Sequence, residues 1–381
     1  MIGSLLHNEK VRNVAAQAIL LAAFAASLLW LVANTAENLS ARGIRVGWDF
    51  LWRSANFPIS ESVLPYSPSD TFLWAIMVGI GNTLFLSVVV VVLATLLGTV
   101  VGLARRSANP LLSAVTGCFV TTARNTPLIV QLLFWYALLT TALPAPRQAL
   151  NPFPGVYLSL RGIYVPSLSV DGNASAFWIG ALVAAAAIVW VGLRFGRGRL
   201  SGRWLYPSLA LGSLITAVMV AAAAGAQLSA TSPELRGLNF TGGMRLSSEF
   251  AALMIGLVLY TSAFVGEIVR GGIDAVARGQ WEAGRALGLT EGQILRKVVA
   301  PQALRVIIPP MTSQYVSAAK NTTLALAVGY PELGLVIGTV INQTGQAIES
   351  LLVLLGVFLA ISLSVSGAMN WLNRKVALVQ R

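Results

Sequence analysis

The chain has 381 residues, of which 56% are hydrophobic and 10% are charged, and its mean hydropathy is +0.74. Soluble domains carry roughly 25% charged residues, so this composition excludes an ordinary soluble protein and predicts an integral membrane protein. The single cysteine, Cys118, excludes an intrachain disulfide, and the single histidine, His7, excludes His-ligated zinc and Ser-His catalysis. The net charge of +12 comes from Lys and Arg that stand mostly between apolar stretches, which argues against nucleic acid as a partner.

Eight apolar stretches are long enough to cross a bilayer, because about 20 apolar residues in a helix span its hydrocarbon core. They cover residues 14–33, 72–103, 111–142, 177–193, 207–227, 249–270, 306–328 and 350–372. The first is longer than a secretory core usually is, so we expect a retained span and not a cleaved signal peptide. Lys and Arg gather in alternate connecting segments, which predicts that both termini are cytoplasmic.

Two of the connecting segments, 34–71 and 143–176, are rich in Pro and contain scattered Asn, Ser and Gly. They are predicted to be extracytoplasmic loops. In the span that follows Arg124, Pro127 would interrupt the helical hydrogen bonding and bend the helix.

The cytoplasmic segment 270–301 carries signals for two short helices joined by a tight turn. Asp274 is placed to cap a first helix, which would end at Gly288, a residue suited to left-handed backbone. Thr290 and Gln293 then form a capping box for a second helix. Four apolar residues would share one side of it: Ile294, Leu295, Val298 and Val299.

This segment resembles the EAA loop of ABC-importer membrane subunits, which reads Glu-Ala-Ala, a Gly four residues after the second Ala, and Ile-x-Leu-Pro further along. The sequence departs from it at Gly284, Val298 and Ala300, which are small or apolar changes. The resemblance implies that the loop docks in a cleft of a cytoplasmic ATPase. The implied coupling residues are Glu282, Ala283, Gly284, Arg285, Gly288 and Pro301. Small side chains, among them Ala283, Gly284, Ala286 and Gly288, would let the partner approach the backbone.

Further segments narrow the resemblance to the polar amino-acid, histidine-permease-type branch. They are Gly81–Leu84, Arg124–Leu128 with Gln131, Phe264–Ile273 and Lys320–Leu324, and Asn125 stands where that branch commonly has Gly. The matching regions are roughly 76–142 and 249–373. The additional first span and the inserted pair of spans resemble the long permease subunits of general L-amino-acid importers.

The resemblance implies an all-α integral inner-membrane protein with a MetI-like permease core of five helices plus three extra helices. The expected division is 1–71 as an N-terminal helix and periplasmic loop, 72–142 as the first core part, 143–248 as an insertion of periplasmic loops and a helix pair, and 249–381 as the second core part. The chain would carry L-amino acids from periplasm to cytoplasm without being an enzyme. Its implied partners are two ABC ATPase subunits, a second homologous permease subunit, a periplasmic amino-acid-binding protein and membrane lipid.

No cofactor is expected in this chain, because ATP and Mg²⁺ would be bound by the partner ATPase. None of the four lysines follows a glycine, so the GxxxxGK[ST] phosphate loop is absent from the sequence.

Polar residues inside the apolar stretches are candidates for the substrate path, because an amino acid needs partners for its ammonium and carboxylate groups. The hypothesised lining is Asn82, Thr83, Thr126, Gln131 and Glu267. Arg124, Glu267 and Lys320 are charged, and a structural role in pairing or snorkelling is as good an interpretation of them as transport.

Three other interpretations stay open at this point. An ion-coupled secondary transporter or channel would use Glu267 and Lys320 as a coupling pair. A membrane-anchored regulator would bind DNA through the basic 270–301 loop. The two loop helices would otherwise lie on lipid headgroups with no protein partner.

Overall fold

The computed structural model describes residues 9–41, 47–171 and 227–376. The predicted spans at 177–193 and 207–227 therefore lie outside the described residues, apart from the last residue of the second. The described chain is mostly helical and confirms an all-α membrane fold. It forms two compact units, of which one comprises Met1–Gln131 with Met254–Arg381 and the other Leu132–Leu253.

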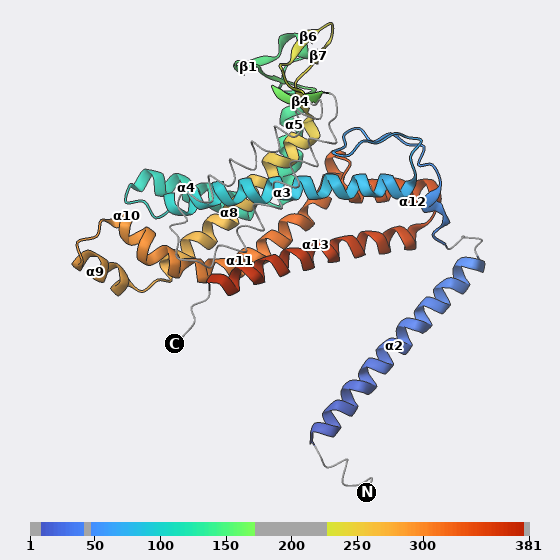
Figure 1. The fold of residues 1–381 in the computed structure, drawn as a ribbon, viewed down its shortest axis with the longest axis horizontal. Helices are drawn as coiled ribbons and strands as arrows, with labels where there is room; N and C mark the ends of the chain where they lie inside the picture. The colour runs from blue at the N-terminus through green and yellow to red at the C-terminus, as the bar shows by residue number, and fades with distance from the viewer. Residues whose placement is uncertain (1–8, 42–46, 172–226, 377–381) are drawn as a thin grey trace. The chain divides into compact units, whose positions relative to one another are not determined.

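The helices of the chain follow in this order (Figure 1): α2 Glu9–Ala41, α3 Phe72–Ala104, α4 Pro110–Asn125, α5 Leu128–Thr141, α8 Ser248–Asp274, α9 Arg278–Ala286, α10 Glu291–Ile294, α11 Ala300–Asn321, α12 Leu333–Thr344 and α13 Ala347–Val376. Short 3₁₀ segments are η1 Asp49–Trp52, η2 Pro146–Gln148 and η4 Thr322–Val328, and η3 Leu295–Val299 is a π-helix. Among the described residues, four helices are long and apolar enough to cross a membrane: α2, α3, α8 and α13. Glu291–Val328 and Leu333–Thr344 meet the same criterion only when taken together, as a pair bent by 53°.

The predicted span at 111–142 does not form one helix. α4 ends at Asn125 and α5 begins at Leu128, with Thr126 between them in an extended conformation (φ −93°, ψ 127°). Proline disfavours helical backbone in the residue before it and provides no N–H, so Pro127 accounts for the interruption. The expectation that Pro127 interrupts the helix is confirmed.

Close packing of α3 on α8 depends on two glycines one turn apart, Gly98 and Gly102. A Cβ at Gly98 would come within 2.6 Å of Val265, and one at Gly102 within 2.6 Å of the Gly266 carbonyl oxygen. Small residues four apart allow this approach of two helix backbones in membranes, where packing drives helix association. α11 also packs along α13, and α12 packs against α3 (Figure 1).

The second unit contains short antiparallel strands that the sequence analysis did not predict. They are β1 Leu150–Phe153, β2 Val156–Ser159, β3 Gly162–Val165, β4 Ser167–Asp171, β5 Gln227–Thr231, β6 Glu234–Arg236, β7 Asn239–Thr241 and β8 Met244–Leu246. One sheet has the order β1-β2-β3-β8, and β4-β5 and β6-β7 form two separate antiparallel pairs. The ring of Phe240 contacts the rings of Tyr157 and Tyr164, with centroids 4.6 and 4.8 Å away, and forms a small aromatic core.

Candidate coupling site

The first short helix of the 270–301 segment is α9, and it begins differently from the prediction. Asp274 is the last residue of α8 and not a helix cap, so that expectation is wrong. The N-cap position of α9 is Ala277, which makes no side-chain cap hydrogen bond. The Asp274 carboxylate instead accepts hydrogen bonds from Arg106 and Arg270, each 2.7 Å long, because ion pairing across the end of α8 competes with capping.

The turn between α9 and α10 has the predicted form. Gly288 is left-handed (φ +70°), and the Leu289 N–H donates to the Gly284 carbonyl at 3.1 Å, as in a Schellman motif. The capping box is also confirmed, since Thr290 accepts from the Gln293 N–H and the Gln293 side chain accepts from the Thr290 N–H. This turn is therefore fixed by local sequence signals.

The second helix is not a separate short helix. α10 has four residues and continues through the π-helical turn η3 directly into the membrane helix α11. Ile294 and Val299 are fully buried and Leu295 and Val298 partly buried, so the predicted apolar side is confirmed. Any displacement of α10 is passed along a continuous helical path to α11.

The helix pair shares one apolar core with the membrane helices. Ile294 and Val299 are buried in a cluster with Ile273 of α8 and Ile307 of α11, and Trp281 of α9 packs against it. Gln302 of α11 donates to the Gln280 carboxamide oxygen of α9 at 3.1 Å. Because protein cores are close-packed and transmit strain, this arrangement lets α9 and α10 move together with α8 and α11.

The proposed partner surface differs from the prediction at Gly284. Its buried Cα faces Ile294, where a Cβ would come within 2.7 Å of Cγ1, so Gly284 allows α9 to approach α10 and is not open to a partner. Glu282, Ala283, Arg285 and Pro301 are exposed, together with Gly288. Leu287 beside the turn is 79% exposed, a large apolar side chain that the sequence analysis missed.

Arg106 at the end of α3 joins three elements. Its Nε lies 2.7 Å from Asp274 Oδ1, and its guanidinium lies 5.3 Å from the ring centroid of Trp281 on α9. A polar cavity of about 520 Å³ surrounds this contact and is also lined by Arg278, Glu282 and Arg285. The position of α9 is thus linked to the C-terminal ends of both α3 and α8.

An exposed ion pair closes the helix pair across its turn. Arg285 Nε donates to Glu291 Oε1 over 2.6 Å. This hydrogen bond holds the pKa of the Glu291 carboxyl below its ordinary value and raises the pKa of Arg285. Because both groups are fully exposed, salt and water screen the pair.

Two residues of the hypothesised substrate path, Asn82 and Thr83, are fully buried on α3. Asn82 accepts from the Val63 N–H and donates to the carbonyls of Glu61 and Pro331, over 2.8 to 2.9 Å. Thr83 donates to the Gly79 carbonyl and accepts from the N–H of Leu333, both at 3.0 Å. Each side chain binds backbone at the start of α12.

The other three path candidates lie at different places. Gln131 donates to the carbonyls of Ala123 (2.8 Å) and Thr126 (3.0 Å), and the Thr126 hydroxyl donates to a carbonyl within α4. Glu267 forms ion pairs with Arg105 and with Arg270. Among these described residues no hydrogen bond or ion pair joins Asn82 or Thr83 to the other three. A path role for the five stays a prediction.

Glu267 and Lys320, the coupling pair of the secondary-transporter interpretation, do not form an ion pair in the described part of the chain. Lys320 is exposed near the end of α11, and in the described part of the chain the recorded ion pairs of Glu267 are to arginines. Arg124 lies over the ring of Phe264, 5.0 Å from its centroid, so its charge has an aromatic partner on α8.

Comparison with known proteins identifies the family. Residues 94–378 match the family described as binding-protein-dependent transport system inner membrane component. YhdX of Escherichia coli (strain K12), named as an amino-acid ABC transporter permease, is 43% identical across 98% of this chain and 96% of its own length. The general L-amino acid transport system permease AapQ of Rhizobium johnstonii is 37% identical, covering 99% and 95%.

A third relative is also named as an amino-acid transport permease. The glutamate/glutamine/aspartate/asparagine transport system permease BztB of Rhodobacter capsulatus is 34% identical over 100% of this chain and 97% of its own. The three relatives match nearly end to end, so the similarity includes the first helix and the insertion as well as the core. The chain therefore belongs to the family of inner membrane components of binding-protein-dependent transport systems.

Proposed function

We propose that this permease subunit carries L-amino acids from periplasm to cytoplasm, and that ATPase subunits drive it through the α9–Gly288–α10 helix pair. The full-length relatives named for general L-amino acids and for glutamate, glutamine, aspartate and asparagine support the substrate class. The core shared by α9, α10, α8 and α11 is the observation that carries the coupling role, because it lets a push on the helix pair reach two membrane helices.

The assembly that fits this role contains a second permease subunit, two cytoplasmic ATPase subunits that bind ATP and Mg²⁺, and a periplasmic binding protein. The helix pair then faces the cytoplasm, as do both termini. Binding protein delivers the amino acid, ATPase closure moves α9 and α10, and the membrane helices change between outward and inward access. The binding protein supplies most of the side-chain selectivity in this arrangement.

Docking is tested at Leu287, whose exposed side chain offers the apolar anchor that interfaces commonly place near their centre. The tagged full chain is expressed with the genes of its transport system, and co-purified ATPase and uptake of labelled L-amino acids are measured. Leu287→Asp is expected to lower both about tenfold, which corresponds to roughly 1.4 kcal/mol of binding energy. Leu238→Asp, at another exposed leucine, is the matched control and is expected to change neither.

Retention of the ATPase at normal uptake in Leu287→Asp, and in a Glu282→Lys variant of the same surface, would overturn the docking proposal. A second outcome separates the competing class. If the chain purified alone catalyses gradient-driven amino-acid uptake into vesicles, then it is an ion-coupled transporter and needs no ATPase.

Transmission is tested at Arg106, which follows the C-terminal end of α3, contacts Asp274 and Trp281, and lines the same polar cavity as Glu282 and Arg285. Arg106→Gln removes the ion pair and the cation–π contact while every side chain of α9 and of the turn after it is kept. We expect the ATPase to co-purify normally and hydrolyse ATP, whereas uptake per ATP falls several-fold. Equal losses of ATPase binding and uptake would show instead that Arg106 only supports the fold of the helix pair.

A further inference from the structure

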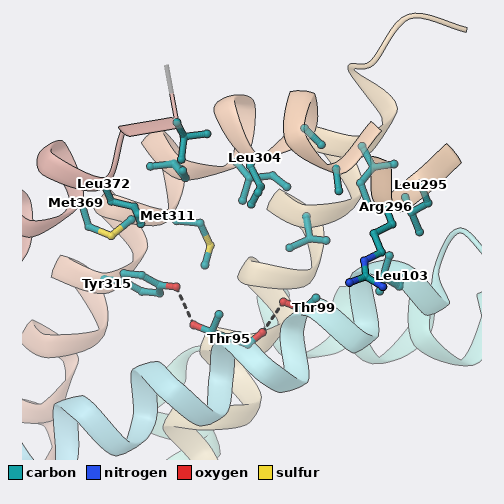
Figure 2. Close-up of a pocket in the computed structure, with 17 residues that line it drawn as sticks. Thr95, Thr99, Leu103, Leu295, Arg296, Leu304, Met311, Tyr315, Met369 and Leu372 are labelled. Atoms are coloured by element: carbon teal, nitrogen blue, oxygen red, sulfur yellow. Dashed lines mark hydrogen bonds between the residues drawn. The ribbon is translucent and has the colours of Figure 1, made fainter. Parts of the chain in front are cut away.

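A second cavity, of about 530 Å³, lies between α3, α8, α11 and α13 (Figure 2). Its volume falls in the range of roughly 300–1,000 Å³ that is typical of small-molecule sites. It differs in chemistry from the polar cavity around Arg106, because its walls are almost entirely aliphatic. Among its lining residues are Leu304, Ile307 and Met311 of α11 and Met369 and Leu372 of α13.

The cavity is elongated along one stripe of α11. Its lining on this helix runs from Ala300 through Leu304, Ile307 and Met311 to Tyr315, at helical spacings of three and four residues. At 1.5 Å per residue the stripe is about 22 Å long. One leaflet of a bilayer has a hydrocarbon thickness of about 15 Å, so the groove has the length of an extended acyl chain with part of its headgroup.

The hydroxyl groups in the cavity already have partners. The Thr95 and Tyr315 hydroxyls lie 2.8 Å apart, and Thr99 donates to the Thr95 carbonyl (Figure 2). The Thr95 hydroxyl also donates to the Val91 carbonyl. Among the described residues that line this cavity there is no carboxylate. A zwitterionic amino acid would lose its hydration here without gaining partners for its ammonium group, so the transported substrate does not fit this site.

One charged side chain, Arg296, lines the cavity, and it stands at one end of the stripe. Figure 2 shows its guanidinium beside Leu103, with Tyr315 at the opposite end. In the described part of the chain, the Arg296 side chain forms neither an ion pair with an Asp or Glu nor a hydrogen bond. The neighbouring end of α13 adds Arg374 and Lys375, and Lys375 lies over the ring of Trp371, an arrangement typical of the membrane interface.

We propose that this cavity binds one anionic phospholipid, with an acyl chain along the α11 stripe and its phosphate at Arg296. The aliphatic walls hold the chain, and the guanidinium provides the paired donors that phosphate oxygens accept. Basic residues at the end of a membrane helix attract anionic headgroups in the same way. The lipid fills the space between α3, α11 and α13, and it therefore supports the helices that receive the motion of α9 and α10.

The test uses the full chain in nanodiscs made either of dioleoylphosphatidylglycerol or of dioleoylphosphatidylcholine. Native mass spectrometry counts the lipids that each chain retains after release. We expect one phosphatidylglycerol retained per chain at least tenfold more often than phosphatidylcholine. Arg296→Gln is expected to abolish this preference, whereas Lys297→Gln, which removes the same charge from the next residue, one that does not line the cavity, is expected to keep it.

Occupation of the groove is tested by filling it. Leu304→Trp places an indole on the cavity wall and is expected to remove the retained lipid, whereas Leu359→Trp on the exposed side of α13 is the matched control and is expected to keep it. Retention of the lipid by Leu304→Trp and by Arg296→Gln would overturn the proposal. A disulfide between Cys introduced at residue 304 in two permease subunits of the assembled transporter would also overturn it, because a protein would then cover the cavity.

Discussion

Two helix breaks in the described part of the chain are stabilised in different ways. At the first, between α4 and α5, the side chain that satisfies the freed carbonyls comes from Gln131, eight residues after Ala123. At the second, between η4 and α12, the partners Asn82 and Thr83 come from α3, about 250 residues earlier in the chain. Hydrocarbon supplies no hydrogen bonds, so each break persists only because such partners exist.

The difference shows what each break does for the fold. At the first break the freed carbonyls are satisfied by a side chain of the same segment, so these hydrogen bonds involve no other part of the chain. The second ties α12 to α3, and through Val63 it also ties both to the loop that precedes α3. Gly79 brings the helices into contact there, since a Cβ would lie 3.1 Å from the Cα of Leu333.

The hydrogen bonds at the two breaks involve three of the five residues hypothesised to line the substrate path. Asn82, Thr83 and Gln131 are polar residues within apolar helices, yet each is hydrogen-bonded to backbone, including backbone groups at the breaks. A side chain engaged in this way must release a backbone group before it can bind a substrate. Loss of stability and loss of uptake should therefore be measured together for these residues.

The largest effect is expected for Asn82→Leu. The substitution leaves the Val63 N–H and the carbonyls of Glu61 and Pro331 without the Asn82 amide. The bond to Pro331 is buried and the other two are partly buried, and a buried group left without its partner costs about 1–3 kcal/mol. We expect the free energy of unfolding, measured by denaturant titration in detergent, to fall by about 3 kcal/mol or more. Asn38→Leu on the exposed face of α2 serves as the control and is expected to stay within about 0.5 kcal/mol. Normal stability with uptake abolished would instead assign Asn82 to the substrate path.

The next largest loss of unfolding free energy is expected for Thr83→Val. Valine has nearly the same shape but cannot accept the hydrogen bond from the buried Leu333 N–H, which is 3.0 Å from the hydroxyl oxygen. The expected loss is about 1–2 kcal/mol in the same titration. Thr99→Val on the same helix is the matched control. The Thr99 hydroxyl donates to the Thr95 carbonyl one turn back, so its removal should leave the free energy of unfolding nearly unchanged. Equal losses in the two variants would contradict a tie between α3 and α12.

The sequence indicated the features whose causes are local. Gly288 and the Thr290–Gln293 capping box define a turn within a few residues, and Pro127 interrupts its own helix, so each was predictable from spacing and backbone preference. Apolar length identified the long helices for the same reason.

Features that depend on tertiary contacts were not predictable in this way. The spacing of the EAA loop does not show that Gly284 faces Ile294, nor that Asp274 pairs with Arg106 of α3. The Pro331 carbonyl that Asn82 binds is 249 residues away in the chain. From sequence alone, a polar residue in an apolar helix is therefore as consistent with a substrate path as with a structural role. The strands between residues 150 and 171 are short, and no clear alternation distinguished them from loop.

The smallest effect is expected for Gln131→Leu at the break between α4 and α5, and this substitution also tests whether Pro127 causes the break. In a continuous helix the Ala123 carbonyl would accept from the N–H of residue 127, but Pro127 has none, and the Gln131 amide takes that place at 2.8 Å. Gln131→Leu is therefore expected to reduce the unfolding free energy by about 1 kcal/mol, because a carbonyl tolerates an unfilled partner better than an N–H does. In a Pro127→Ala background the N–H is restored and residue 126 can become helical, so the same substitution should have almost no effect. The double-mutant cycle tests whether Gln131 replaces the missing N–H. Its coupling energy is expected to be about 1 kcal/mol if Gln131 does so and near zero if it does not.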